Sequence, residues 1–285
     1  MTAIRRRVLP YFLLGPGTIW LVLFFVVPLF YMGKLSLESG VVGNLEFSWN
    51  WSNFSGALSL YNTQFVRSFI YAGLATLIAL LIAYPLAYVI AFRAGRWRNV
   101  LLFAVVAPFF TTYLIRTIAW ETMLSDQSPV VSVLNYLGLT THGHVLATGG
   151  AVIAGLTYNF LPFMILPIYA SLERIDERLI EAAKDLYASA SAAFWKVTLP
   201  LSAPGIVAGV LLTFIPASGD YVNAQFLGSA GNQMIGNVIQ ALYLKQSDYP
   251  AAAALSFVLM ALIMVAVFVY LRFAGSEALM GEEAR

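Results

Sequence analysis

The sequence contains six apolar runs, and five of them are long enough to cross a membrane. A spanning helix needs about 20 apolar residues, because each residue adds about 1.5 Å. Nonpolar side chains make up 60% of the 285 residues and charged ones only 11%, which excludes an ordinary water-soluble domain. We therefore predict an all-α membrane protein in which residues 1–285 form one transmembrane domain of six helices. The predicted spans are 11–32, 69–92, 100–120, 147–169, 205–226 and 251–273.

Basic residues are distributed unevenly over the predicted loops. With the N-terminus inside, 12 of the 16 Lys and Arg residues fall on the inner side, and the four on the outer side are Lys34, Arg67, Arg116 and Lys245. Cytoplasmic loops of membrane proteins carry such an excess of basic residues. We therefore expect a multi-pass protein of the bacterial inner membrane with both termini in the cytoplasm. The loop between the fourth and fifth spans lies on the same side in this topology.

This cytoplasmic loop, residues 171–204, has a charged, amphipathic helical pattern. Apolar residues recur every three or four positions from Leu172 to Leu186, and acidic residues fall on another face. Asp176 is a candidate N-cap of a first short helix, and Ser189 of a second helix that ends before Pro200. A loop that rests on the anionic inner leaflet would be basic. The acidic residues therefore favour contact with a partner protein.

The stretch EAAKDLYASASAAFWKVTLPLSAPGI, residues 181–206, resembles the EAA loop of ABC-importer permeases. That pattern is E-A-A, three residues, G-A, then an aromatic, a branched residue, L-P and P-G. The matching residues are Glu181, Ala182, Ala183, Ala188, Phe194, Val197, Leu199, Pro200, Pro204 and Gly205. The stretches PFFTTYLIRTIAW and FIPASGDYVNAQFLG resemble the spermidine/putrescine branch of the family. Tyr187 replaces the glycine of the pattern, so it either bears the strain of a left-handed turn or the turn is built differently.

The resemblance implies one subunit of a larger transporter. It implies a non-catalytic permease of an ATP-driven importer that moves polyamines, or alternatively another small solute, into the cytoplasm. The expected partners are a second permease (a distinct sister chain), two ATPase subunits and an extracytoplasmic substrate-binding protein. ATP and Mg would bind to the ATPases, and this chain would hold no cofactor; its sequence contains no G-x-x-x-x-G-K-[ST] motif. The residues expected to couple to the ATPase are Asp176, Glu181, Ala182, Ala183, Lys184, Asp185, Tyr187 and Ala188.

Two ionisable residues fall within the predicted spans, Arg116 in the third and Asp220 in the fifth. Charges at membrane depth are costly and mark functional sites, and a helix broken by Pro and Gly must face protein or water. A carboxylate among aromatic rings suits a polyamine through charge pairing and cation–π contacts. The candidates for a substrate path are Tyr113, Arg116, Trp120, Glu121, Tyr158, Asn159, Asp220, Tyr221 and Asn223. Alternatively, Arg116 pairs with Asp220 or Glu121 for structural reasons.

Other classes of function agree less well with the sequence. An ion-coupled secondary transporter usually shows internal repeats or acidic residues in several spans, and neither feature is visible. A membrane enzyme needs a nucleophile–base pair or a metal cluster. The chain has no cysteine, and we expect His142 and His144 to be solvated residues of an outer loop. We therefore expect neither a metal site nor a nucleic-acid partner.

Single cysteines can test the predicted topology, because the chain has none of its own. His142→Cys should react with a membrane-impermeant thiol reagent from the outside of cells, since the topology places it in an outer loop. Ser189→Cys should react only after the inside is exposed. The reverse pattern of labelling would contradict the orientation.

Overall fold

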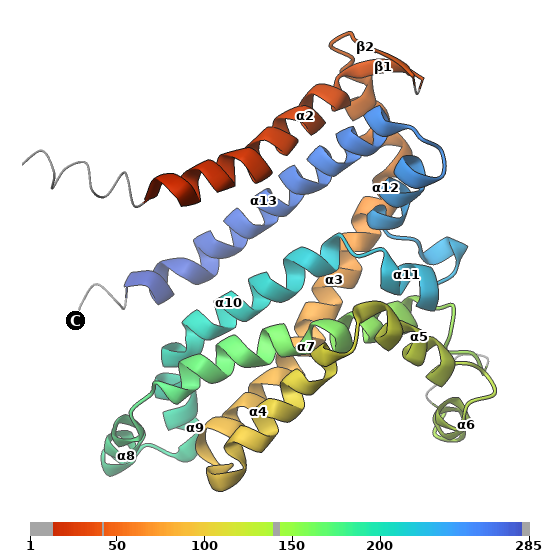
Figure 1. The fold of residues 1–285 in the computed structure, drawn as a ribbon. Helices are drawn as coiled ribbons and strands as arrows, with labels where there is room; N and C mark the ends of the chain where they lie inside the picture. The colour runs from red at the N-terminus through yellow and green to blue at the C-terminus, as the bar shows by residue number, and fades with distance from the viewer. Residues whose placement is uncertain (1–13, 42, 139–142, 281–285) are drawn as a thin grey trace, which may run out of the picture. The chain divides into compact units, whose positions relative to one another are not determined.

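The computed structural model describes residues 14–41, 43–138 and 143–280 (Figure 1). His142 therefore lies outside the described residues. A short hairpin is formed by strands β1 (Glu38–Val41) and β2 (Asn44–Phe47). The helices are α2 (Val27–Ser36), α3 (Ser52–Phe92), α4 (Arg98–Val106), α5 (Tyr113–Met123), α6 (Pro129–Tyr136), α7 (Gly149–Glu173), α8 (Glu177–Asp185), α9 (Ala190–Ala193), α10 (Leu199–Ser218), α11 (Val222–Leu227), α12 (Ile235–Leu244) and α13 (Tyr249–Met280).

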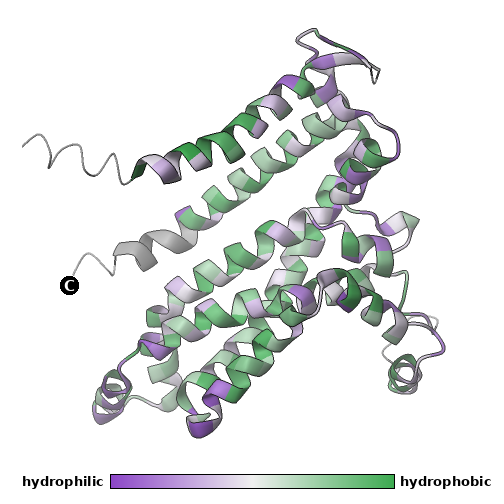
Figure 2. Cartoon of the chain, viewed as in Figure 1, coloured by the Kyte–Doolittle hydropathy of each residue, from purple (hydrophilic) through white to green (hydrophobic). Residues whose placement is uncertain are grey.

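The predicted all-α membrane fold is confirmed. Among the described residues, five helices are long and apolar enough to span a bilayer, and a bent pair brings the number to six if it forms one span. Hydrophobic residues run along the long helices, and hydrophilic residues gather at their ends (Figure 2). The five helices are Leu14–Ser36, Ser52–Phe92, Gly149–Glu173, Ala190–Ser218 and Tyr249–Arg272, and the bent pair is Gly95–Phe110 with Tyr113–Met123.

The second predicted span, 69–92, covers only the apolar part of a longer helix. α3 begins at Ser52, whose N–H donates to the side-chain oxygen of Asn50 over 3.3 Å. The helix leaves regular geometry at Tyr61, with φ −117° and ψ 20°. Residues 52–68 are too polar to count toward a hydrophobic span, but hydropathy does not decide whether a segment is helical, because tertiary packing also stabilises helices. Hydropathy alone therefore missed the first turns of α3.

The third predicted span, 100–120, is not one straight helix. It divides into Gly95–Phe110 and Tyr113–Met123, whose axes differ by 94°. Pro108 lies in a 3-10 turn at Ala107–Phe110, and Thr111 follows in an extended conformation (φ −100°, ψ 140°). Proline cannot supply the N–H that would continue the helix. The sharp bend places Tyr113 at the start of a new helix.

The fifth predicted span, 205–226, is shifted toward the N-terminus. Helical structure runs from Ala190 to Ser218, and the expected stop before Pro200 is wrong. A π-helical turn at 194–198 leads into α10, so that Pro200 stands in the first turn of α10, where a missing N–H costs little. The helix ends instead at Gly219, and α11 starts afresh at Val222.

The chain divides into two units, which are described separately. The first comprises residues 1–62 and 239–260, and the second 63–238 and 261–285. In the first unit the hairpin pairs Glu38 with Phe47 and Val41 with Asn44. The Asn53 side chain donates to the backbone oxygens of Ser36 and Glu38 over 2.9 and 3.0 Å. These bonds fix the start of α3 to the end of α2 and to the first residue of β1.

The core of the second unit is built on close approaches between helices. α3 presents alanines spaced three or four apart, and all of them are fully buried: Ala72, Ala75, Ala79, Ala83 and Ala87. They pack with apolar residues of α7, among them Leu156, Met164 and Ile168. On α10, a Cβ at Gly205 would lie 2.5 Å from Pro167 O. Small residues let helices approach closely in lipid, where van der Waals packing drives association.

Gly209 offers a test of this packing. A Cβ there would lie 2.8 Å from Met164 Sδ and 3.1 Å from Met164 O. Gly209→Leu should therefore separate α7 from α10 and lower the stability of the chain by about 1–3 kcal/mol. Thermal unfolding in detergent measures the effect. Gly73→Leu is the matched control, because nothing lies within 4 Å of a Cβ at Gly73; equal losses in both variants would contradict the packing argument.

Candidate functional site

The loop between α7 and α10 forms the first candidate site. Asp176 caps α8, and its carboxylate accepts the Arg178 N–H over 3.0 Å. Ser189 caps α9 through the Ala192 N–H over 3.2 Å. Both caps were predicted from the sequence. Asp176 is itself a coupling candidate, and the other seven lie between the two caps; none of the residues of α8 is buried.

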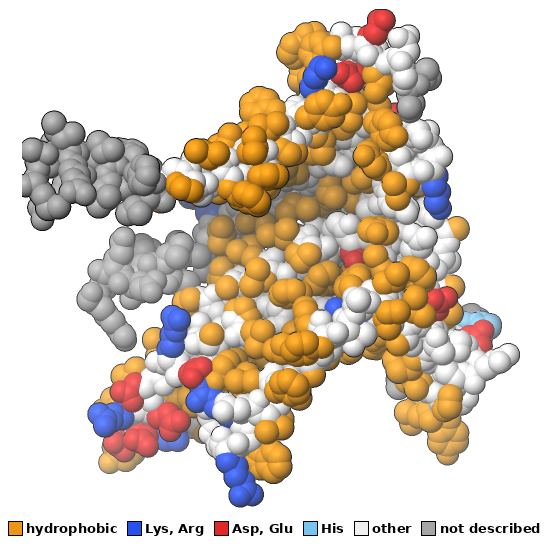
Figure 3. Space-filling model, viewed as in Figure 1, with side chains coloured by type: hydrophobic (Ala, Val, Ile, Leu, Met, Phe, Trp, Pro, Cys, Tyr) orange, Lys and Arg blue, Asp and Glu red, His pale blue; other side chains and the backbone are white. Residues whose placement is uncertain are grey.

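Apolar side chains are exposed on this charged helix and just after it. Leu179 is 43% exposed, Leu186 83% and Tyr187 99%. Glu181, Ala182, Lys184 and Asp185 are also exposed, and acidic and basic side chains crowd this end of the second unit (Figure 3). Exposed apolar residues within a polar rim are typical of a protein contact surface.

Tyr187 adopts the left-handed conformation, with φ +62°. The turn around it is hydrogen-bonded on both sides: the Tyr187 N–H donates to Lys184 O over 2.9 Å, and the Ala188 N–H donates to Ala183 O over 3.0 Å. This pair of bonds defines a Schellman motif, in which glycine usually occupies the position of Tyr187. Of the two alternatives for this turn, tyrosine therefore bears the strain, which costs roughly 1–2 kcal/mol.

An ion pair anchors the base of the loop. Arg98, the first residue of α4, pairs with Glu173, the last residue of α7, and also donates to the Tyr169 hydroxyl. The Arg98 guanidinium lies 5.2 Å from the centre of the Tyr169 ring. These contacts join α4 to the end of α7 at the base of the loop.

The second candidate site is a buried polar cluster where two helices are interrupted. The Asp220 carboxylate follows the end of α10 and accepts hydrogen bonds from the Tyr113 hydroxyl and from the Asn223 N–H, the latter over 2.8 Å. The Asn223 side chain donates to Asp220 over 3.2 Å and to the Tyr113 hydroxyl over 2.5 Å. Asp220 is only 9% exposed and Asn223 is fully buried.

Asn159 joins this cluster to α7. Its side chain donates to Asn223 Oδ1 over 3.1 Å and to Thr117 Oγ1 over 3.3 Å. Asn159 is 1% exposed and Thr117 is fully buried. The structure thus brings four predicted residues together, Tyr113, Asn159, Asp220 and Asn223. Thr117 was missed by the sequence analysis, although its position four residues after Tyr113 places it on the same face of a helix.

Arg116 lies beside this cluster without an ionic partner. Its guanidinium is 4.9 Å from the Phe109 ring centre and 5.7 Å from that of Tyr113. The side chain is 8% exposed, and its Nε and Nη1 atoms make no hydrogen bond. Among the described residues, no ion pair joins Arg116 to Asp220 or Glu121.

The remaining path candidates lie outside the hydrogen-bonded cluster. Trp120 and Tyr158 form a ring pair with centroids 5.4 Å apart. Tyr221 is 43% exposed, and its backbone oxygen accepts from the Asn237 side chain over 2.8 Å. Glu121 is partly exposed. These residues therefore flank the cluster rather than complete it.

The described residues contain no group of three or more His, Cys, Asp or Glu side chains able to hold a metal ion. His144 contacts Asp126 through Nδ1 at 2.8 Å, and both side chains are exposed. A single exposed His–Asp pair offers too few ligands for a stable metal site.

Known proteins with similar sequences are membrane components of transport systems. The sequence profile described as "Binding-protein-dependent transport system inner membrane component" matches residues 83–276. The spermidine/putrescine transport system permease protein PotB of Haemophilus influenzae is 38% identical over 89% of this chain and 90% of its own length. PotB of Escherichia coli strain K12 is 37% identical over 89% of this chain and 93% of its own length.

Solved structures with a similar fold come from importers of other solutes. A bacterial alginate ABC transporter in complex with its alginate pentasaccharide-bound periplasmic protein aligns with a TM-score of 0.71. The alignment covers 97% of both chains at 19% identity. The MetNI methionine ABC transporter aligns with a TM-score of 0.60 over 78% of this chain and 98% of the other, at 16% identity. At these identities the likeness concerns the fold alone.

Proposed function

Since the chain belongs to the family of binding-protein-dependent transport system inner membrane components, we propose that it is the permease subunit of an ATP-driven importer that moves polyamines into the cytoplasm. The observation that carries this proposal is its 37–38% identity, over 89% of its length, to permeases named for spermidine and putrescine. Both candidate sites fit a role in such an importer.

Other chains hydrolyse ATP in this proposal. Two ATPase subunits, which bind ATP and Mg, dock from the cytoplasm. A second, distinct permease completes the membrane part, and a substrate-binding protein delivers the polyamine from outside. The absence of a G-x-x-x-x-G-K-[ST] motif in this chain supports this division of roles.

The loop around α8 is suited to receive force from an ATPase. Leu186 and Tyr187 supply exposed apolar surface at its tip, and Ala182 and Ala183 allow close approach of a partner backbone. Asp176 and Ser189 stiffen the loop by capping both of its helices. A stiff element transmits a push better than a flexible one, and the Arg98–Glu173 pair passes it to α4 and α7.

Asp220 is suited to attract a cationic substrate. Its hydrogen-bond donors, Tyr113 and Asn223, are neutral, and no Lys or Arg among the described residues lies within ion-pair distance of it. No cation among the described residues therefore competes with a substrate for this carboxyl group. A substrate ammonium group can replace the Tyr113 hydroxyl and gain a charge–charge interaction, which is stronger away from water.

Arg116 keeps this site weak. A cation that enters the cluster is attracted by Asp220 and repelled by the guanidinium over Phe109 and Tyr113. Passage through a membrane requires binding that is favourable enough for entry and weak enough for release. The pair of opposite charges, separated by neutral side chains, provides such a balance.

Reconstitution with its partners tests the function. The complete transporter in liposomes should hydrolyse ATP faster when the binding protein carries spermidine or putrescine, and it should accumulate the labelled polyamine. Amino acids and metal chelates serve as controls. Stimulation by one of these instead would leave the importer class intact and disprove the polyamine assignment.

Tyr187→Gly tests the docking surface. Glycine relieves the left-handed strain but removes an aromatic contact, so affinity for the ATPase should fall although the loop itself is more stable. Binding of purified ATPase to the permease pair measures this. Ser125→Gly, in an outer loop, is the control. Unchanged affinity and unchanged coupled transport would show that Tyr187 makes no contact.

Asp220→Asn tests the substrate path. The amide keeps the shape of the side chain but removes the charge, so polyamine uptake should fall by at least about tenfold while the complex still assembles. The double variant with Arg116→Gln separates the alternatives. If the double variant recovers transport, the two charges compensate each other for structural reasons, and the proposed substrate contact is wrong.

A further inference from the structure

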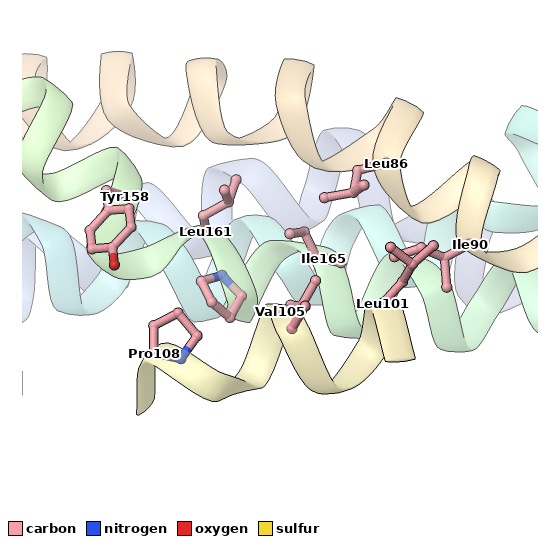
Figure 4. A pocket seen from close by; sticks show the side chains of 10 residues that line it. Leu86, Ile90, Leu101, Val105, Pro108, Tyr158, Leu161 and Ile165 are labelled. Atoms are coloured by element: carbon pink, nitrogen blue, oxygen red, sulfur yellow. The ribbon is translucent and has the colours of Figure 1, made fainter. Parts of the chain in front are cut away.

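An apolar groove in the second unit is not explained by polyamine transport. It lies between α3, α4 and α7 and has a volume of about 310 Å³ (Figure 4). Its lining is aliphatic or proline apart from Tyr158, and no lining residue carries a charge. A polyamine would find no counter-ion in it. The groove therefore suits an uncharged chain.

A basic turn follows one end of this groove. Ile90 and Leu101 line that end, and Tyr158 and Pro108 line the other (Figure 4). The turn between α3 and α4 begins only three residues after Ile90. It contains Arg93, Arg96 and Trp97, all exposed, with Trp97 at 57%. Exposed tryptophan at a helix end is typical of the membrane–water interface.

Arg93 and Arg96 are available to a ligand. Within the described part of the chain, neither forms an ion pair, and the Arg96 guanidinium lies only against the Trp97 ring, 5.9 Å from its centre. Arg98, by contrast, is committed to Glu173 and Tyr169. Two exposed arginines therefore lie close in sequence to the end of the apolar groove, Arg93 three residues after Ile90 and Arg96 five residues before Leu101.

We propose that this groove and turn bind an anionic phospholipid, with one acyl chain in the groove and the phosphate at Arg93 and Arg96. From Leu101 to Pro108 the groove extends about 10 Å at 1.5 Å per residue, which is about two thirds of the roughly 15 Å of one leaflet. Basic pockets between transmembrane helices on the cytoplasmic side recognise anionic headgroups. The sequence predicts this turn to be cytoplasmic.

The groove is large enough for one lipid chain. It is about twice as large as an engineered 150 Å³ cavity that binds benzene. Its lining runs from Leu101 in α4 to Pro108 just after that helix, so it is elongated, as a linear hydrocarbon chain requires.

Photo-crosslinking tests the proposal on the assembled transporter in nanodiscs. The probes are phosphatidylglycerol and phosphatidylcholine, each with a diazirine near the end of one acyl chain. Phosphatidylglycerol should label peptides within 101–108 and 158–165 in preference to phosphatidylcholine. Arg93→Gln and Arg96→Gln should each reduce that preference about fivefold. Arg272→Gln, which changes an exposed arginine at the end of the apolar span Tyr249–Arg272, should leave it unchanged.

A second pair of variants tests the groove itself. Ala104→Phe narrows the groove and should abolish labelling, whereas Val100→Phe, exposed on the same helix but outside the groove, should not. If the transporter with Ala104→Phe fails to assemble, the lipid labelling of the arginine variants still tests the proposal. Equal labelling by both lipids would overturn the proposal. The variant Ala104→Cys gives a second outcome that would overturn the proposal. If its thiol forms a disulfide with a cysteine of the second permease and no lipid adduct is found, a subunit occupies the groove.

Discussion

The need to satisfy every backbone hydrogen bond within the bilayer governs this structure. Lipid cannot bond to a free N–H or C=O, so a spanning helix can be interrupted only where protein replaces the missing partners. The second unit has two such interruptions, at Thr111–Thr112 and at Gly219–Tyr221. Tyr113 follows the first, Asp220 lies in the second, and their side chains are hydrogen-bonded to each other. The polar cluster thus joins the two interruptions, and at the second of them the Asp220 side chain accepts the Asn223 backbone N–H.

The two candidate sites differ in the burial of their residues. The membrane cluster hides its polar atoms, and Asn159 and Asn223 are almost fully buried. The loop around α8 does the reverse, because α8 has no buried residue and Tyr187 is almost fully exposed. A buried polar network fixes the positions of its side chains, whereas exposed apolar residues are typical of a surface that binds another protein. α7 joins them, with Asn159 near one site and Glu173 at the base of the other.

α7 also lines the apolar groove, so three distinct chemistries meet along this one helix. Tyr158 lines the groove and contacts Trp120, whereas the adjacent Asn159 faces the polar cluster. Successive residues of a helix point about 100° apart, which lets one segment serve lipid on one side and a charged path on another. In the proposed transporter this separation keeps hydrocarbon out of the polar path.

The sequence by itself determined the membrane class, the number of spans and both loop caps, because length, hydropathy and capping are local properties. Asp176 and Ser189 act over two or three residues and were predicted correctly. Tertiary structure decided what depends on distant partners. The bend after Pro108, the passage of the helix through Pro200, the contact of Asn159 with Thr117 and the isolation of Arg116 could not be read from hydropathy. Whether a proline ends a helix or a charge finds a partner depends on which neighbours the packed helices bring within a few ångströms, and that is a property of the fold rather than of any one segment.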